Sequence, residues 1–217
     1  MKTKITSFLS ALDPNTFRRT VLLLTFGIFI CSAQPAWSFR ILFKEQLWQL
    51  HHRQLYSYPL DIAENIHWLE QALRADFANP LWALARISNP QEWEKYRHLF
   101  MMQINLTLVD LYLQWGTKYN KFEAFFFNYP WRNQNLESLE KAETLFEFAL
   151  VYWEEAKRFS DLASRFRWLF LTDVQHWEDQ NWRIQTGDLN YERIINRHLA
   201  RLREVRATFM AMDETTF

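Results

Sequence analysis

The chain has 217 residues, of which 49% are hydrophobic and 18% aromatic, and its formal net charge is zero. This length and composition suit one medium-sized domain with a buried core and exclude a disordered chain. The balanced charge gives no global attraction for nucleic acid, so we expect no nucleic-acid partner.

Glycine and cysteine are scarce, which narrows the possible chemistry. The three glycines are Gly27, Gly116 and Gly187, so no glycine-rich nucleotide-binding loop and no serine-nucleophile motif is present. The one cysteine, Cys31, lies in the N-terminal apolar segment, so the chain beyond it has no disulfide, cysteine-ligated zinc or cysteine nucleophile. Tight turns need glycine, so its scarcity favours long helices.

Residues 1–38 predict a secretory signal peptide or an uncleaved signal anchor. Basic side chains precede an apolar run over 20–33, which is shorter than the roughly 20 residues needed to cross a bilayer. The small residues Ala36 and Ser38 follow it and predict cleavage before Phe39.

The N-terminal segment leaves two alternatives to a cleaved signal open. One is an anchor retained in the inner membrane, and the other is a lipoprotein modified at Cys31. The bulky residues Phe29 and Ile30 before this cysteine disfavour the lipoprotein. In all three cases we expect residues 39–217 to lie across the membrane, in a bacterial periplasm, as a single all-helical domain.

The first half of this domain shows apolar residues at helical spacing. Helices are predicted over 39–58 and 60–77, and Asn79-Pro80 ends the second one and starts a short segment over 81–87. Asn89-Pro90 predicts the start of the next helix, because asparagine caps helices well and proline is favoured at the first helical position. We expect this helix to be buried on most sides and to end near Gly116.

The second half predicts three more helices after an ordered connection over 121–135. Two of them cover 136–162 and 165–183. Gly187 then interrupts the chain, and Asn190 is placed to cap a last helix whose buried stripe is Ile195, Leu199, Leu202, Val205, Phe209 and Met212. No segment alternates as a strand would. The fold class is therefore all-α, with six to eight helices.

Two pieces of sequence resemble the second helix of a tetratricopeptide repeat. In "HWLEQALRADFANP" and in "KAETLFEFALVYW", small and large apolar residues recur at helical spacing, as at Ala142, Phe146 and Ala149. In that family the small residues let a paired helix approach closely and the large residue fills the gap. Ala72 and Ala149 are 77 residues apart, which is not twice the family's repeat of about 34. The resemblance is to a divergent array of antiparallel helical hairpins, and a generic helical bundle is the alternative.

This resemblance implies a non-enzymatic adaptor or scaffold that binds other envelope or periplasmic proteins. Small exported proteins of this type serve as parts or assembly factors of large envelope machines, such as secretion systems, outer-membrane complexes and the flagellar-motor collar. The chain would be associated with the inner membrane if its N-terminal segment is not cleaved.

The titratable residues predict neither a metal site nor a catalytic site, and we expect no cofactor. The best candidate cluster is Asp173, His176 and Asp179, which would share a face if 165–183 were helical, but a solvated helix surface explains it better. The carboxylate pairs Glu140/Glu143 and Glu154/Glu155 lie among basic residues at ordinary helix-surface spacing. An envelope hydrolase with one catalytic glutamate leaves no such pattern and stays open.

Two features are candidates for protein binding. The first is a stretch of aromatic residues, which either fills the space between helix pairs or forms an exposed docking patch: Phe122, Phe125, Phe126, Phe127, Tyr129 and Trp131. The second is the row Arg193, Arg197 and Arg201, whose guanidinium groups suit an acidic partner, or else form a solvated face. The alternative function is a helical binding protein whose aromatic residues line a pocket for an apolar or cell-wall-derived ligand.

Overall fold

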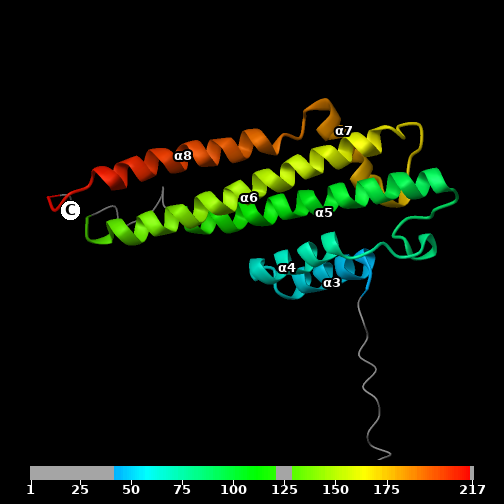
Figure 1. Cartoon of the computed structure of the whole chain (residues 1–217), viewed down its shortest axis with the longest axis horizontal. Coiled ribbons are helices and arrows are strands. Elements are labelled where there is room, and N and C mark those ends of the chain that lie inside the picture. The colour runs from blue at the N-terminus through cyan, green and yellow to red at the C-terminus, as the bar shows by residue number, and fades with distance from the viewer. Residues whose placement is uncertain (1–41, 121–128, 216–217) are drawn as a thin grey trace, which may run out of the picture. The chain divides into compact units, whose positions relative to one another are not determined.

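The computed structural model describes residues 42–120 and 129–215, all within the compact unit Ile41–Phe217. Over these residues the regular elements are six α-helices and three short 3-10 helices, and no strand forms (Figure 1). The all-α prediction is therefore confirmed. In the same residues no helix is both long and apolar enough to cross a membrane. The predicted export signal lies outside the described residues.

Helices α3 (Lys44–Ser57) and α4 (Ile62–Arg74) form the first hairpin. Their apolar faces pack together, and Leu47 of α3 and Ile66 of α4 are both buried. The side chain of Lys44 donates hydrogen bonds to the carbonyl oxygens of Ala72 (2.8 Å) and Leu73 (2.7 Å). These carbonyls belong to the last turn of α4 and have no partner within the helix, so Lys44 caps α4 from the start of α3.

The segment after α4 is mostly irregular. At the start of the short segment predicted over 81–87, the 3-10 turn η1 (Pro80–Trp82) forms, and the rest of the segment has no regular structure. Helix α5 (Pro90–Tyr119) follows, and the Asn89 side chain accepts a hydrogen bond from the Glu92 backbone N–H at 2.9 Å, which confirms the predicted cap. The predicted end of α5 near Gly116 is wrong by one turn.

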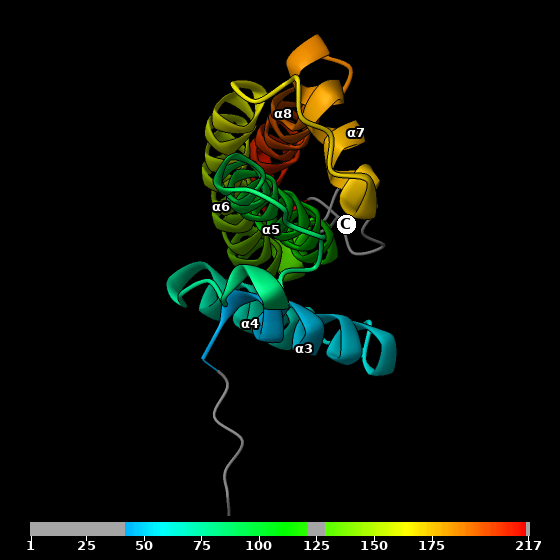
Figure 2. The same ribbon diagram turned by 90° about the vertical axis from the view of Figure 1, so that its right-hand side faces the viewer.

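The 3-10 turn η2 (Tyr129–Trp131) leads directly into helix α6 (Arg132–Ser164). Helix α6 runs back along α5. These two long helices share the most extensive packing in the described chain, and Figure 2 shows them side by side. Ala142, Phe146 and Ala149 are fully buried in α6. The Phe146 ring lies close to Gly116 of α5 and to the His198 ring.

The chain between α6 and α7 differs most from the sequence-based expectation. The predicted helix over 165–183 is wrong in its first half, where turns and the 3-10 turn η3 (Thr172–Val174) replace it. The physical reason is that the Leu171 N–H donates to the Glu178 side chain, and the Leu169 carbonyl accepts from Lys95. Backbone groups used in this way cannot continue a helix. Helix α7 (Gln175–Thr186) starts only after this segment.

The last helix, α8 (Tyr191–Ala211), packs along α6 on the side away from α4. Gly187 ends α7 with a backbone φ of +80°, which glycine adopts without strain. The Asn190 side chain accepts from the Arg193 N–H at 3.0 Å, so this predicted cap is confirmed. The predicted stripe is buried at five positions and half-buried at the sixth: Ile195, Leu199, Leu202, Val205, Phe209 and Met212.

Candidate functional site

The predicted aromatic patch lies only partly within the described residues. Tyr129 and Trp131 are in η2, whereas Phe122, Phe125, Phe126 and Phe127 lie outside the described residues. Trp131 is 45% exposed and lines a surface pocket of 320 Å³ together with Tyr119 and Lys141. Trp131 therefore lies at the surface where α6 begins, close to the end of α5.

The start of α6 is tied to the end of α8. Arg132 donates hydrogen bonds from Nε to the Phe209 carbonyl (2.9 Å) and from a terminal nitrogen to the Met210 carbonyl (3.2 Å). One step farther along, Arg206 of α8 forms an ion pair with Glu143 of α6 at 2.6 Å. A pocket of 490 Å³ lies between the two helices and is lined by Asn133, Leu136, Glu137, Glu140, Arg206 and Met210. We use the name Trp131 end for Trp131, Arg132, Glu143 and the residues that line this pocket.

The row of arginines lies on α8 as a solvent-facing stripe. Arg193, Arg197 and Arg201 are exposed, and they lie on the side of the helix away from its buried residues. Arg201 pairs with Glu204 at 3.5 Å, but both side chains are more than half exposed, so this pair adds little stability. Among the described side chains, no ion-pair partner is present for Arg193 or Arg197.

The acidic candidates for metal binding are not brought together. Asp173 lies in η3 and accepts a hydrogen bond from the Arg86 N–H at 2.7 Å, so the expected shared helix face with His176 and Asp179 does not exist. In the part of the chain that the structure describes, no group of three His, Cys, Asp or Glu residues could hold a metal ion. Glu154 and Glu155 make surface ion pairs with Lys157 and Arg158, at 2.8 Å and 2.5 Å.

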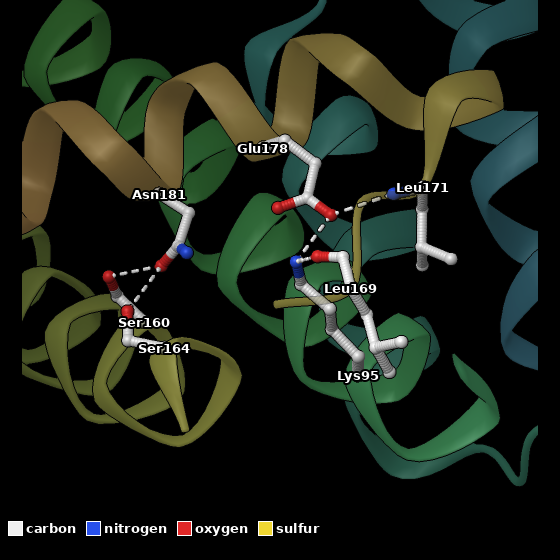
Figure 3. A network of polar contacts seen from close by, with 7 residues as sticks. All are labelled: Lys95, Ser160, Ser164, Leu169, Leu171, Glu178 and Asn181. Atoms are coloured by element: carbon white, nitrogen blue, oxygen red, sulfur yellow. Dashed lines mark hydrogen bonds and ion pairs between the residues drawn. The ribbon is translucent and has the colours of Figure 1, made fainter. Parts of the chain in front are cut away.

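A polar site that the sequence analysis missed lies at the other end of α6. Lys95 of α5 and Glu178 of α7 form an ion pair of 2.7 Å, and their side chains are only 3% and 6% exposed (Figure 3). Lys95 also donates to the Leu169 carbonyl, and the same Glu178 oxygen accepts from the Leu171 N–H at 3.0 Å. Each charge is therefore satisfied by its partner and by backbone. The pair holds the turn segment after α6 against α5.

A second set of hydrogen bonds beside this ion pair connects α7 to α6. The Asn181 side-chain oxygen accepts from the hydroxyls of Ser160 (2.6 Å) and Ser164 (3.4 Å). Gln185 donates from Nε2 to the Ser160 hydroxyl at 3.0 Å and to Asp161 at 2.9 Å. Ser160 is fully buried and Asn181 is 8% exposed, so the bond between them is shielded from solvent, whereas the bond between Gln185 and Asp161 lies at the surface.

These two sets of contacts border a pocket of 470 Å³, which we call the α7 pocket. Phe170 and Trp182 line it and are 57% and 63% exposed. The complete lining is Lys95, Ser164, Arg167, Leu169, Phe170, Glu178, Asp179, Asn181, Trp182 and Gln185. Lys95 and Glu178 are 83 residues apart, so no spacing in the sequence pointed to this site.

Two further titratable groups, one buried and one half-buried, lie in the first hairpin. His51 of α3 is 1% exposed, and burial, with a smaller contribution from His52, lowers its pKa to about 4. Glu70 of α4 accepts hydrogen bonds from the hydroxyls of Tyr112 and Tyr152, each at 2.8 Å. Burial and the bond to Glu70 raise the pKa of Tyr152 to about 12. These contacts join α4 to both long helices.

Comparison with known proteins identifies a family but no characterised relative. No curated protein and no solved structure matches the chain. A family model described as a domain of unknown function, DUF8513, matches residues 91–212. The match covers more than half of the chain, from the first turn of α5 to just beyond α8, and includes the α7 pocket and the arginine row. The chain belongs to the DUF8513 family.

Proposed function

We propose that this protein is a non-enzymatic adaptor that binds other proteins of the bacterial envelope. The observation that carries the proposal is the exposure of four tryptophans, which ranges from 45% to 75%: Trp82, Trp131, Trp168 and Trp182. Tryptophan dominates the binding energy of protein interfaces, and exposed apolar surface is costly without a partner. Such side chains on a packed helical frame favour a binding role.

In this proposal the helices form a rigid frame that holds the binding side chains in place. We interpret α3–α4 and α5–α6 as antiparallel hairpins of a divergent, tetratricopeptide-like array. At 30 and 33 residues, α5 and α6 are each nearly as long as a whole two-helix repeat of that family, so helix length is where the divergence lies. The polar ties at the Trp131 end and at the α7 pocket support the frame, because each one joins α6 to a different helix.

The proposed contacts to a partner are Trp131 and the arginine row. Trp131 supplies a large aromatic surface next to a pocket. Arg193 and Arg197 each offer a planar group of donors that binds a carboxylate through two hydrogen bonds. The partner surface that meets α8 is therefore expected to be acidic.

The proposed place of action is the periplasm. Its support is the sequence alone: a basic segment, an apolar run and small residues before Phe39. A partner within a large envelope assembly, such as a secretion machine or the flagellar-motor collar, fits an exported adaptor.

Site-specific photo-cross-linking in the protein's own cells tests the proposal. A photoreactive amino acid replaces Trp131 or Arg197 in the full-length chain, and a matched variant carries it at the exposed Ala63 of α4. We expect one or a few defined protein adducts at positions 131 and 197 and none at 63. The absence of adducts at 131 and 197, or the same diffuse adducts at all three positions, would overturn the proposal.

A further inference from the structure

Two polar atoms in the α7 pocket make no hydrogen bond to any residue that the structure describes. The hydrogen bonds of Asn181 are made by its oxygen, and those of Glu178 by one of its two carboxylate oxygens. In Figure 3 the Asn181 nitrogen and the other Glu178 oxygen carry no dashed line and point into the space between the two side chains. Both residues are more than nine-tenths buried and line the pocket.

The hydrogen-bond chain determines which way the Asn181 amide points. The Asp161 carboxylate, at one end of this series of hydrogen bonds, can only accept, so Gln185 must present its NH2 group to it. The same NH2 group donates to the Ser160 oxygen, which leaves the Ser160 proton free to bond with Asn181. The Asn181 oxygen faces Ser160 and accepts this proton, and the Asn181 NH2 group faces the pocket. One donor and one carboxylate acceptor are thus available side by side.

The pocket wall indicates which kind of ligand these atoms could bind. Two positive residues, Lys95 and Arg167, are balanced by two negative ones, Glu178 and Asp179, so the wall favours neither cations nor anions. Seven of the ten lining side chains are polar or charged, which is unsuited to a purely apolar anchor. A hydroxyl group both donates and accepts, so adjacent hydroxyls match the free Asn181 and Glu178 atoms.

The two aromatic residues of the wall complete this chemistry. Phe170 and Trp182 present large, mostly exposed rings on a pocket that is otherwise polar. The negative face of an aromatic ring attracts weakly positive C–H groups, such as those on one side of a pyranose. The pocket volume of 470 Å³ falls in the range of roughly 300–1,000 Å³ for small-molecule sites.

We propose that the α7 pocket binds a neutral sugar residue of a glycan. The sugar ring lies against Trp182 or Phe170, and its hydroxyls bond with the Asn181 NH2 group and the free Glu178 oxygen. Arg167, Asp179 and Gln185 provide further hydrogen bonds at the margin. This site lies at the opposite end of α6 from Trp131, so it is independent of the proposed contacts at Trp131 and the arginine row.

Binding of the purified full chain to a printed array of neutral and anionic glycans, followed by calorimetric titration of the best neutral glycan, tests this proposal. Trp182→Ala removes an exposed ring of the pocket, and Trp168→Ala is its matched control, because Trp168 is 67% exposed but does not line the pocket. Asn181→Asp keeps the oxygen that the serines bind and removes the donor. Thermal melting checks that each variant is folded.

We expect saturable binding of a neutral glycan, weakened at least about tenfold by Trp182→Ala and by Asn181→Asp and within about twofold of wild type in Trp168→Ala. Three results would overturn the proposal: no glycan binds more tightly than about 10 mM, only anionic glycans bind, or Trp168→Ala weakens binding as much as Trp182→Ala.

Discussion

Gly116 of α5 and Phe146 of α6 are packed so closely that a Cβ atom added to Gly116 would lie 2.5 Å from Cε1 of the Phe146 ring. The ring cannot move aside freely, because it is fully buried and its centroid is 5.1 Å from that of His198 in α8. Gly116→Val is therefore expected to lower the free energy of unfolding by about 2–3 kcal/mol, as measured by urea denaturation.

Testing a Gly116 substitution in two proteins, wild type and a Phe146→Leu variant, separates the steric clash with Phe146 from the change in helix propensity. Gly116→Ala alone should destabilise the protein, although alanine is the better helix former by about 1 kcal/mol. In a Phe146→Leu background the smaller side chain leaves room, so the same Gly116→Ala change should become neutral or stabilising by up to about 1 kcal/mol. Equal effects of Gly116→Ala in both backgrounds would contradict the packing account.

For the buried ion pair Lys95–Glu178, we expect the removal of one charge to destabilise the protein more than the removal of both. Lys95→Met leaves the Glu178 carboxylate without its charged partner, and we expect a loss of about 3–5 kcal/mol in unfolding free energy. In the double variant Lys95→Met/Glu178→Gln the remaining group is neutral and can still accept from the Leu171 N–H, so part of this loss should be recovered. Chemical denaturation of both variants measures the difference. A double variant less stable than Lys95→Met argues against this interpretation.

The pH dependence of stability should depend on His51. Its pKa is lowered to about 4 in the folded protein, so the unfolded chain, with a histidine pKa near 6.5, binds a proton more readily. Stability from the neutral His51 is therefore present above pH 6.5 and is lost as the pH falls from 6.5 toward 4. At about 1.4 kcal/mol per pKa unit, wild type should lose about 2 kcal/mol more than His51→Gln between pH 7 and pH 5.

The neighbouring histidine is the matched control for this experiment. His52 is exposed and makes only the smaller contribution to the lowered pKa of His51, so His52→Gln should keep most of the pH dependence of the wild type. The lowered pKa values of His98 and His198 act in the same direction, but they are common to wild type and variants and cancel in the comparison. Identical pH profiles for wild type and His51→Gln would show that His51 does not titrate as described.

Glu70 should matter more than either tyrosine that it binds. Glu70→Ala leaves the hydroxyls of Tyr112 and Tyr152 without their acceptor, and we expect a loss of about 2–3 kcal/mol, whereas Tyr152→Phe alone should cost about 1 kcal/mol. Glu70→Gln retains an acceptor and serves as the control. In a Tyr112→Phe/Tyr152→Phe background, thermal and urea unfolding should show a much smaller effect of Glu70→Ala. An undiminished effect would assign another role to Glu70.

Local signals in the sequence predicted much of this fold. The Asn89 and Asn190 caps, the interruption at Gly187 and the buried stripe of α8 depend on neighbouring residues only, and all are present in the structure. The burial of Ala142, Phe146 and Ala149 also follows from spacing within one helix.

The errors arose where distant residues decide the local structure. Gly116 was expected to end α5, but it lies within the helix, where a side chain would occupy the space of the Phe146 ring, 30 residues later in the sequence. The expected helix after α6 is interrupted where the Leu169 carbonyl is bound by Lys95, 74 residues earlier. The α7 pocket could not be predicted for the same reason, since its charged and amide groups come from α5, from α7 and from the turn segment after α6.

The central claim is that Trp131 and the arginine row of α8 bind another protein. The size of the native complex tests this claim most directly. The tagged full-length chain, expressed at its natural level, is solubilised from its own envelopes and analysed by native mass spectrometry. The account predicts a complex well above the 26.5 kDa chain, containing a few other proteins in fixed ratio, which is reduced to the free chain by Trp131→Ala/Arg197→Glu without loss of stability. A wild-type chain found alone, or only with copies of itself, would contradict the account.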